Sequence, residues 1–222
     1  VSKGAQPGNY EVGTTLTATM TANFTKQDAG ALTTIKISDG TVDVLEGTTS
    51  PLVLSDHSIT IGEGTTSFKA TASYAEGVIK QDNLGDDSPA GHITAGSITS
   101  NVLSYVGKRN AFYGTGVGSV PELNSAIIRG LTGKSLNPAA GTKLTIKVAQ
   151  GQQHIIFAYP AALRDVSQVK YEETNDIGMA SSFTKQTVSV EGANGATATS
   201  YKVYSYAMAA PAAAPMTFTV TI

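Results

Sequence analysis

The sequence predicts an all-β (mainly β) protein with two β-sandwich domains in tandem, the second carrying one short amphipathic helix. The 222 residues include 29 Thr and 20 Ser, while charged residues make up only 14%. Exposed faces of β-sheets favour this composition, because Thr fits the pleat whereas Lys and Glu are depleted there. Short runs of alternating polarity also recur about every ten residues, which is typical of a sandwich.

Residues 1–107 form the first predicted domain. Residues 15–24 alternate strictly, with Leu16, Ala18 and Met20 on one side and threonines on the other, which indicates a half-buried strand. Further alternating runs follow at residues 34–37, 41–45, 52–54, 58–61, 68–74 and 98–106. The polar segment 80–95 is predicted to be a long loop at a surface or a subunit contact.

A glycine-rich hinge is expected at residues 108–118, and the second domain at 119–222, with its helix near 119–132. Ser119 is the expected N-cap and Glu122 completes a capping box. Leu123, Ile127 and Leu131 then recur on one helical face.

The rest of the second domain is predicted to be strands, which we place at residues 143–148, 154–159, 183–190, 199–206 and 216–222. Residues 192–195 (Gly-Ala-Asn-Gly) are expected to join two of them as a hairpin. Because residues 217–222 still alternate, the last strand is expected to be paired inside a sheet.

Charge and composition disfavour several classes of partner. The formal net charge is -2 and the isoelectric point is near 5.9, so no basic field is available to bind nucleic acid. The sequence contains no run of about 18 apolar residues, so we expect no membrane insertion. The chain has no Cys, so we expect no disulfide and no cysteine metal site. It starts at Val1 without a signal-peptide pattern, so we expect a processed product or a piece of a longer chain.

Two glycine-rich segments resemble nucleotide-binding motifs only partly. Gly133-Lys134-Ser135 has the ending of a phosphate-binding loop, but it follows a predicted helix, whereas such a loop precedes one. Residues 114–118 (Gly-Thr-Gly-Val-Gly) lack a surrounding parallel βαβ unit. We expect no cofactor.

No metal site is expected. His57, His92 and His154 are far apart in the sequence, and none has a ligand-type partner at metal-binding spacing. Asp82, Asn83, Asp86 and Asp87 offer oxygens for Ca²⁺, but they lack the alternating ligand spacing of an EF-hand.

No catalytic residues are assigned, and the protein is not expected to be an enzyme. Glu172, Glu173 and Asp176 crowd into one polar segment, whereas the carboxylates of a glycosidase usually come from separate elements. A glycan-cleaving enzyme remains a third alternative, and it would require two carboxylates about 5 to 9 Å apart in a groove.

A late cluster of tyrosines could bind a sugar. Tyr204 and Tyr206 share one face of a predicted strand, while Tyr201 lies on the other, so part of this set is expected to pack in the core.

Residues 10–15 (YEVGTT) and 105–114 (YVGKRNAFYG) resemble the opening and closing strands of an Ig-like module in the virion structural proteins of tailed phages, particularly those that infect gut anaerobes. The small β-domain that commonly follows this module is similar to four segments, which are residues 121–131, 157–160 (FAYP), 188–195 (VSVEGANG) and 201–204 (YKVY). The resemblance implies a phage particle and no catalytic residues.

The expected function is therefore that of a non-enzymatic structural component of a bacteriophage virion, in a fibre, the neck, the baseplate or the capsid decoration. Its expected partners are other virion proteins and further copies of itself. The alternative is a module of a phage fibre that binds a host-surface glycan through Tyr204, Tyr206 or the loop 80–95.

Overall fold

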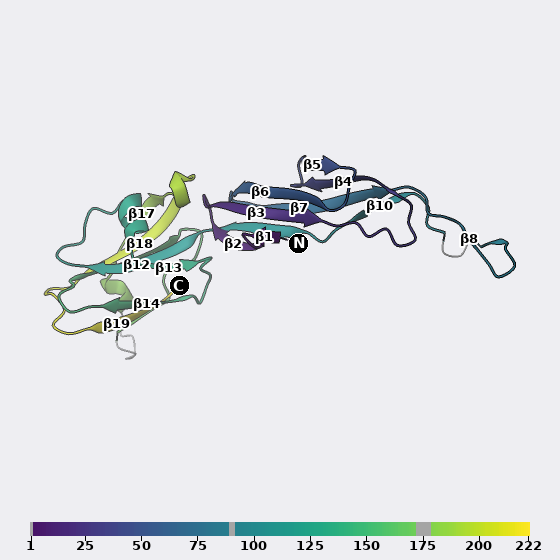
Figure 1. Cartoon of the computed structure of the whole chain (residues 1–222). Helices are drawn as coiled ribbons and strands as arrows, with labels where there is room; N and C mark the ends of the chain where they lie inside the picture. Colours follow the sequence, from purple (N-terminus) through teal and green to yellow (C-terminus); the bar gives the residue numbers. More distant parts are fainter. Residues whose placement is uncertain (1, 89–91, 172–178) are drawn as a thin grey trace. The chain divides into compact units, whose positions relative to one another are not determined.

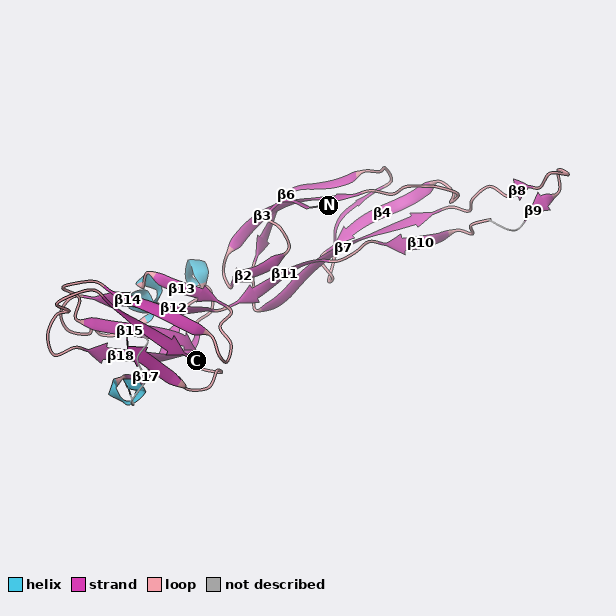
Figure 2. Cartoon of the chain, turned by 90° about the horizontal axis from the view of Figure 1, so that it is seen from below, coloured by secondary structure: helices cyan, strands magenta, loops and turns pink. Residues whose placement is uncertain are grey.

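The computed structural model describes residues 2–88, 92–171 and 179–222, and it divides the chain into two compact units. The first unit comprises residues 1–9 and 15–107, and the second comprises residues 10–14 and 108–222. Both are built from antiparallel sheets (Figures 1 and 2), so the mainly β prediction is confirmed.

Two large sheets and one small hairpin make up the described part of the first unit. The smaller sheet has the order β1 (Ser2–Gly4), β3 (Thr15–Ala22), β6 (Leu52–Thr60). The larger sheet has the order β2 (Gly8–Glu11), β11 (Leu103–Lys108), β7 (Gly64–Tyr74), β4 (Leu32–Ser38), β5 (Asp43–Gly47). A further strand, β10 (Gly96–Thr99), pairs with β7.

The core of the first unit lies between these sheets. The alternation predicted for residues 15–24 is observed, since Ala18 and Met20 of β3 are buried while the threonines between them are more exposed. From the larger sheet, Ile35, Ile37 and Phe68 are buried. The ring of Phe68 packs edge-on against His57 of β6, with ring centroids 5.5 Å apart. The two sheets are thus joined by apolar contact.

Part of the predicted loop 80–95 is a small hairpin. Its strands are β8 (Lys80–Gln81) and β9 (Asp87–Ser88), which pair with each other. The carboxylate of Asp82 accepts hydrogen bonds from the amides of Leu84 (2.8 Å) and Asp86 (3.1 Å), which closes the turn. The hairpin is therefore a formed element. We call residues 78–88 the arm.

The second unit also has two sheets. One has the order β13 (Gly133–Leu136), β12 (Asn110–Gly116), β15 (His154–Pro160), β18 (Thr199–Ala207), β17 (Thr184–Val190). The other has the order β14 (Lys143–Val148), β19 (Met216–Thr221), β16 (Gln168–Tyr171). Two short 3-10 helices are η1 (Met179–Ser182) and η2 (Ala193–Gly195). The predicted hairpin around residues 192–195 is confirmed, and so is the pairing of the last strand inside a sheet.

The central strand β15 is buried along both faces. Ile155, Phe157 and Tyr159 belong to the cluster that includes Phe218 and Val220 of the three-stranded sheet. Ile156 and Ala158 face a second cluster on the opposite side, together with Phe112, Ile128, Val190, Tyr201 and Val203. Burial on both faces explains why β15 reads as a continuous apolar run in place of an alternating one.

The only α-helix among the described residues is α1 (Ser125–Gly130), so the predicted start at Ser119 is wrong. The side chain of Asn124 accepts a hydrogen bond from the Ile127 amide at 3.0 Å and is the true N-cap. Ile128 is the buried residue of the helix, and Leu123 packs against the same cluster from the extended segment before it. Packing of this segment on the sheet overrides its capping pattern.

The segment predicted as a hinge is strand β12, which pairs with β13 on one side and β15 on the other. Its glycines allow close packing. A Cβ at Gly116 would lie 2.5 Å from His154 Nε2, and one at Gly114 would lie 3.3 Å from the Leu131 side chain. A side chain at either position would require His154 or Leu131 to move.

Residues 10–14 are bound into the second unit by hydrogen bonds. The amide of Val12 donates to Lys108 O at 3.0 Å, and its carbonyl accepts from Ala193 N at 2.7 Å. The side chain of Asn194 donates to Gly13 O at 3.0 Å. Three segments that carried the sequence resemblance, 10–15, 105–114 and 188–195, therefore meet in space.

Candidate functional site

The glycine-rich segment that partly resembles a phosphate-binding loop lies in a strand. Gly133, Lys134 and Ser135 lie in strand β13, where no helix N-terminus follows them. A Cβ at Gly133 would meet the Tyr113 ring at 2.2 Å, so this glycine makes room for an aromatic side chain.

The three histidines lie in separate places. His57 packs on Phe68, His92 lies 2.8 Å from Glu76, and His154 is buried with Nδ1 3.1 Å from Gly118 O. Within residues 2–88, 92–171 and 179–222, no group of three His, Asp or Glu side chains could hold a metal ion. None of the helices in these ranges is long and apolar enough to cross a membrane.

Of the acidic residues considered as a glycosidase pair or as Ca²⁺ ligands, the structure describes only those of the arm. Glu172, Glu173 and Asp176 lie outside the described residues. In the arm, Asp82 uses its carboxylate to hold the turn, and the side chains of residues 82, 83, 86 and 87 are exposed.

Two of the three late tyrosines belong to the core. Tyr201 and Tyr204 are buried, and the Tyr204 ring stacks on Phe157 with centroids 4.9 Å apart. Tyr206 is half-buried against Phe183. A sugar-binding platform centred on Tyr204 is therefore wrong, because that ring is covered by neighbouring aromatic side chains.

A polar cluster at the surface of the second unit pins the segment that follows β15. Asp165 accepts hydrogen bonds from Lys185 Nζ at 2.7 and 2.8 Å and lies 2.9 Å from Lys202 Nζ. The hydrogen bond from Lys185, followed by that from Lys202, lowers the pKa of Asp165 to about 2. Burial, followed by the hydrogen bond with Tyr204, raises the pKa of Tyr159 far above its usual value. These contacts tie the segment after β15 to strands β17 and β18.

A cavity lies on one flank of the first unit, between residues of its two sheets. It has a volume of about 490 Å³, within the range of about 300 to 1,000 Å³ typical of binding clefts. We call it the flank groove. Its floor is formed by the core side chains Ile35, Ile37, Phe68 and Ala72.

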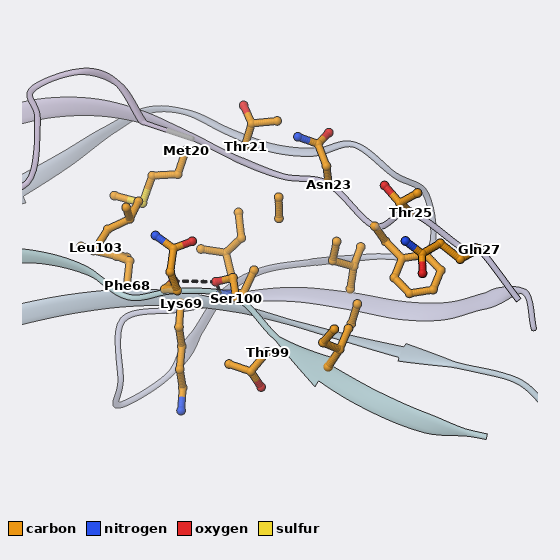
Figure 3. A pocket seen from close by; sticks show the side chains of 18 residues that line it. Met20, Thr21, Asn23, Thr25, Gln27, Phe68, Lys69, Thr99, Ser100 and Leu103 are labelled. Atoms are coloured by element: carbon orange, nitrogen blue, oxygen red, sulfur yellow. Dashed lines mark hydrogen bonds between the residues drawn. The ribbon is translucent and has the colours of Figure 1, made fainter. Parts of the chain in front are cut away.

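The walls of the flank groove come from two segments (Figure 3). One wall runs from Met20 to Gln27, and in Figure 3 Met20 points toward the cavity while Thr21 and Asn23 project to the outer side of this segment. The other runs from Ile98 to Leu103. Lys69 is the one charged residue of the lining, and its side chain points away from the cavity in Figure 3. The groove thus joins an apolar floor to a rim of hydroxyl and amide groups.

The sheet is one strand short beside this groove. Strands β11 and β10 follow one another along the same edge of β7, at Gly64–Phe68 and Thr71–Tyr74. Outside β11 lies β2, whereas outside β10 no described strand is placed, as Figure 2 also shows. Within the described part of the chain, the strand position next to β2, on the outer edge of β10, is therefore empty. We call it the empty row.

The hydrogen-bonding groups of β10 can be assigned by alternation. Ser100 N donates to Ala70 O at 2.8 Å, so residue 100 faces β7, and residue 98 does the same two positions earlier. Thr99 then directs its backbone N–H and C=O away from β7, toward the empty row. Consistent with a non-hydrogen-bonded pair, the hydroxyls of Thr99 and Thr71 lie 3.3 Å apart.

The flank groove was not predicted from the sequence. Residues 98–106 were interpreted as one strand, while the structure has two, separated by a one-residue change of register against β7. Ile98 is a usable signal in retrospect: it is an apolar side chain in a strand exposed throughout, and 59% of its surface is accessible.

Comparison with protein-family models, with curated proteins and with solved structures finds no match to this chain.

Proposed function

We propose that this protein is a non-enzymatic structural component of a bacteriophage virion, in which copies of the chain assemble by adding a β-strand to the flank groove. The phage setting is what the sequence resemblance implies. The observation that carries the mode of assembly is the empty strand position beside β10.

An edge strand next to an open core favours such assembly for two reasons. The outward N–H and C=O groups of Thr99 are a template for main-chain hydrogen bonds. A strand placed there would also cover Ile98 and the groove floor, and the burial of apolar surface contributes about 25 cal/mol per Å².

The lining of the groove suits a polypeptide strand. The rim offers the side chains of Thr25 and Asn101, which can pair with backbone amides, and no carboxylate lines the cavity. These partners matter because burying the N–H and C=O groups of an entering main chain is costly unless the groups are hydrogen-bonded.

The test uses a matched pair of substitutions at Thr99. Thr99→Pro removes the outward N–H but no hydrogen bond to β7, a position at which an edge strand tolerates proline. Thr99→Val keeps the N–H, and both changes delete the contact with the Thr71 hydroxyl. Sedimentation velocity over a concentration series is expected to show association of the wild type and of Thr99→Val, weakened about tenfold or more in Thr99→Pro.

A chain that stays monomeric at every concentration would contradict this proposal. So would association that Thr99→Pro leaves unchanged.

A further inference from the structure

The arm of the first unit carries apolar side chains that no described part of the chain covers. The exposed fractions are 80% for Val78, 45% for Ile79 and 87% for Leu84. Figure 1 shows the β8 hairpin extending beyond the two sheets of this unit. Three large apolar side chains gathered on so short a projection indicate a contact surface.

The tip of the arm is ordered before any contact is made. Besides the bonds to the Asp82 carboxylate, Asp82 N donates to Asp86 O at 2.8 Å and Gly85 N donates to Asp82 O at 3.2 Å. Leu84 is therefore presented on a formed turn. Binding through a preorganised turn loses less conformational entropy than binding through a flexible loop.

We propose that the arm of one copy occupies the flank groove of a second copy. Residues 78–81 of the first copy pair with the outer edge of β10 in the second. The two segments match in length, since β10 also has four residues. Because successive side chains in a strand point to opposite faces, one of Val78 and Ile79 enters the groove above Ile35 and Phe68.

The charges of the two surfaces are compatible. Residues 78–88 carry Asp82, Asp86 and Asp87 against Lys80 alone. The groove presents no carboxylate among its lining residues. Next to Gln27 at one wall, exposed Lys26 and exposed Asp28 balance each other in charge, and Asp28 is paired with Lys80 of the same chain at 2.8 Å. The acidic turn therefore meets a lining without acidic side chains, so like-charge repulsion inside the groove does not oppose association.

A second copy is the occupant that this geometry favours. In the chain itself Val78 and Leu84 are exposed, so the arm does not fill its own groove. Two different surfaces, the arm and the groove, then meet in each contact, which makes the contact heterologous and repeatable from copy to copy. This inference rests on the proposed strand addition and identifies residues 78–81 of another copy as the added strand.

The first test changes the arm alone. The double variant Val78→Ser, Leu84→Ser is expected to weaken association about tenfold or more in sedimentation velocity. The control Val42→Ser removes a similarly exposed apolar side chain (59%) outside both surfaces and is expected to leave association unchanged. Unchanged thermal melts would show that each variant is folded.

The second test traps the contact between two chains. Since the protein has no Cys, one copy carries Leu84→Cys and a mass-tagged copy carries Asn101→Cys, which lines the groove. Under oxidising conditions the mixed 84–101 disulfide is expected to exceed the mixed product of the control pair, Leu84→Cys with Val117→Cys.

The outcomes separate the two proposals. If association is lost in Thr99→Pro but persists in the arm variant, or if the mixed disulfide does not exceed the control, the arm is not the occupant, while strand addition at β10 stands. If the wild type never associates, both proposals fail.

Discussion

Asp165 illustrates how single residues hold the second unit together with few charges. Its carboxylate joins Lys185 of β17 and Lys202 of β18, and Lys202 also donates to Leu163 O at 2.5 Å. One acidic side chain thus fixes the segment after β15 across two neighbouring strands. Removal of this carboxylate should be visible in the pH dependence of stability.

Asp165→Asn is expected to lower the melting temperature of the protein near neutral pH and to have a much smaller effect near pH 2. In the folded state the pKa is lowered from 3.8 to about 2, so the stabilisation is present above 3.8 and lost as the pH falls toward 2. Melting curves from pH 7 to pH 2 measure this. A difference from wild type that stays constant with pH would contradict it, and Lys185→Met should add little in the Asp165→Asn background.

Gly13→Ala is expected to destabilise the protein by about 2 to 4 kcal/mol, because it combines an unfavourable φ with a steric clash. Gly13 has φ +92°, and a Cβ there would lie 1.9 Å from Ala193 O. Gly195→Ala is the control. Its φ is +72° but nothing lies within 4 Å, so a loss of only about 1 kcal/mol is expected in denaturant titrations. Equal losses would contradict the role of the close approach.

At the scale of elements, strand periodicity was the reliable part of the sequence. Strands β3, β14 and β19 match their predicted runs because each buries one face only, which leaves the alternation visible. The errors arose where tertiary packing decides. The N-cap of the helix is Asn124, whereas the capping pattern predicted Ser119. The glycines of β12 allow close packing, whereas the sequence predicted a flexible hinge.

The flank groove shows a different limit. Its lining comes from residues within 20–27, from Ile35 and Ile37, and from residues within 68–72 and 98–103, which only sheet pairing brings together. An empty strand position is a property of the strand order, and no local pattern in the sequence encodes it.

Deletion of β19 is expected to unfold the second unit. β19 is the middle strand of its sheet, paired with β14 and β16, and it supplies Phe218 and Val220 to the core. Circular dichroism and thermal melting should show loss of a large part of the β signal. Phe218→Ala keeps the strand pairing and is expected to cost about 3 to 5 kcal/mol without unfolding it. An unchanged melt after the deletion would mean that this strand is dispensable.

At the scale of the whole molecule, a heterologous contact makes each copy both donor and acceptor. Such contacts close into rings when the rotation between copies allows it and otherwise extend into filaments. A chain with one surface blocked can still use the other, so assembly can be stopped at a defined size.

An equimolar mixture of the Val78→Ser, Leu84→Ser variant with Thr99→Pro is therefore expected to form dimers and nothing larger. The first variant keeps its groove and the second keeps its arm, so one productive contact remains. Light scattering coupled to size exclusion measures the mass. A mixture that stays monomeric, or that grows as large as the wild type, would contradict a donor and acceptor arrangement.

The path of residues 10–14 has a consequence for biosynthesis. Asn194 donates to Gly13 across 181 positions of the chain, so this partner of the segment is synthesised long after the segment itself. Lys108, which accepts from Val12 N, is synthesised earlier, but the carbonyls of Val12 and Gly13 stay solvated until Ala193 and Asn194 arrive. The second unit therefore closes around residues 10–14 at the entropic cost of a very long loop.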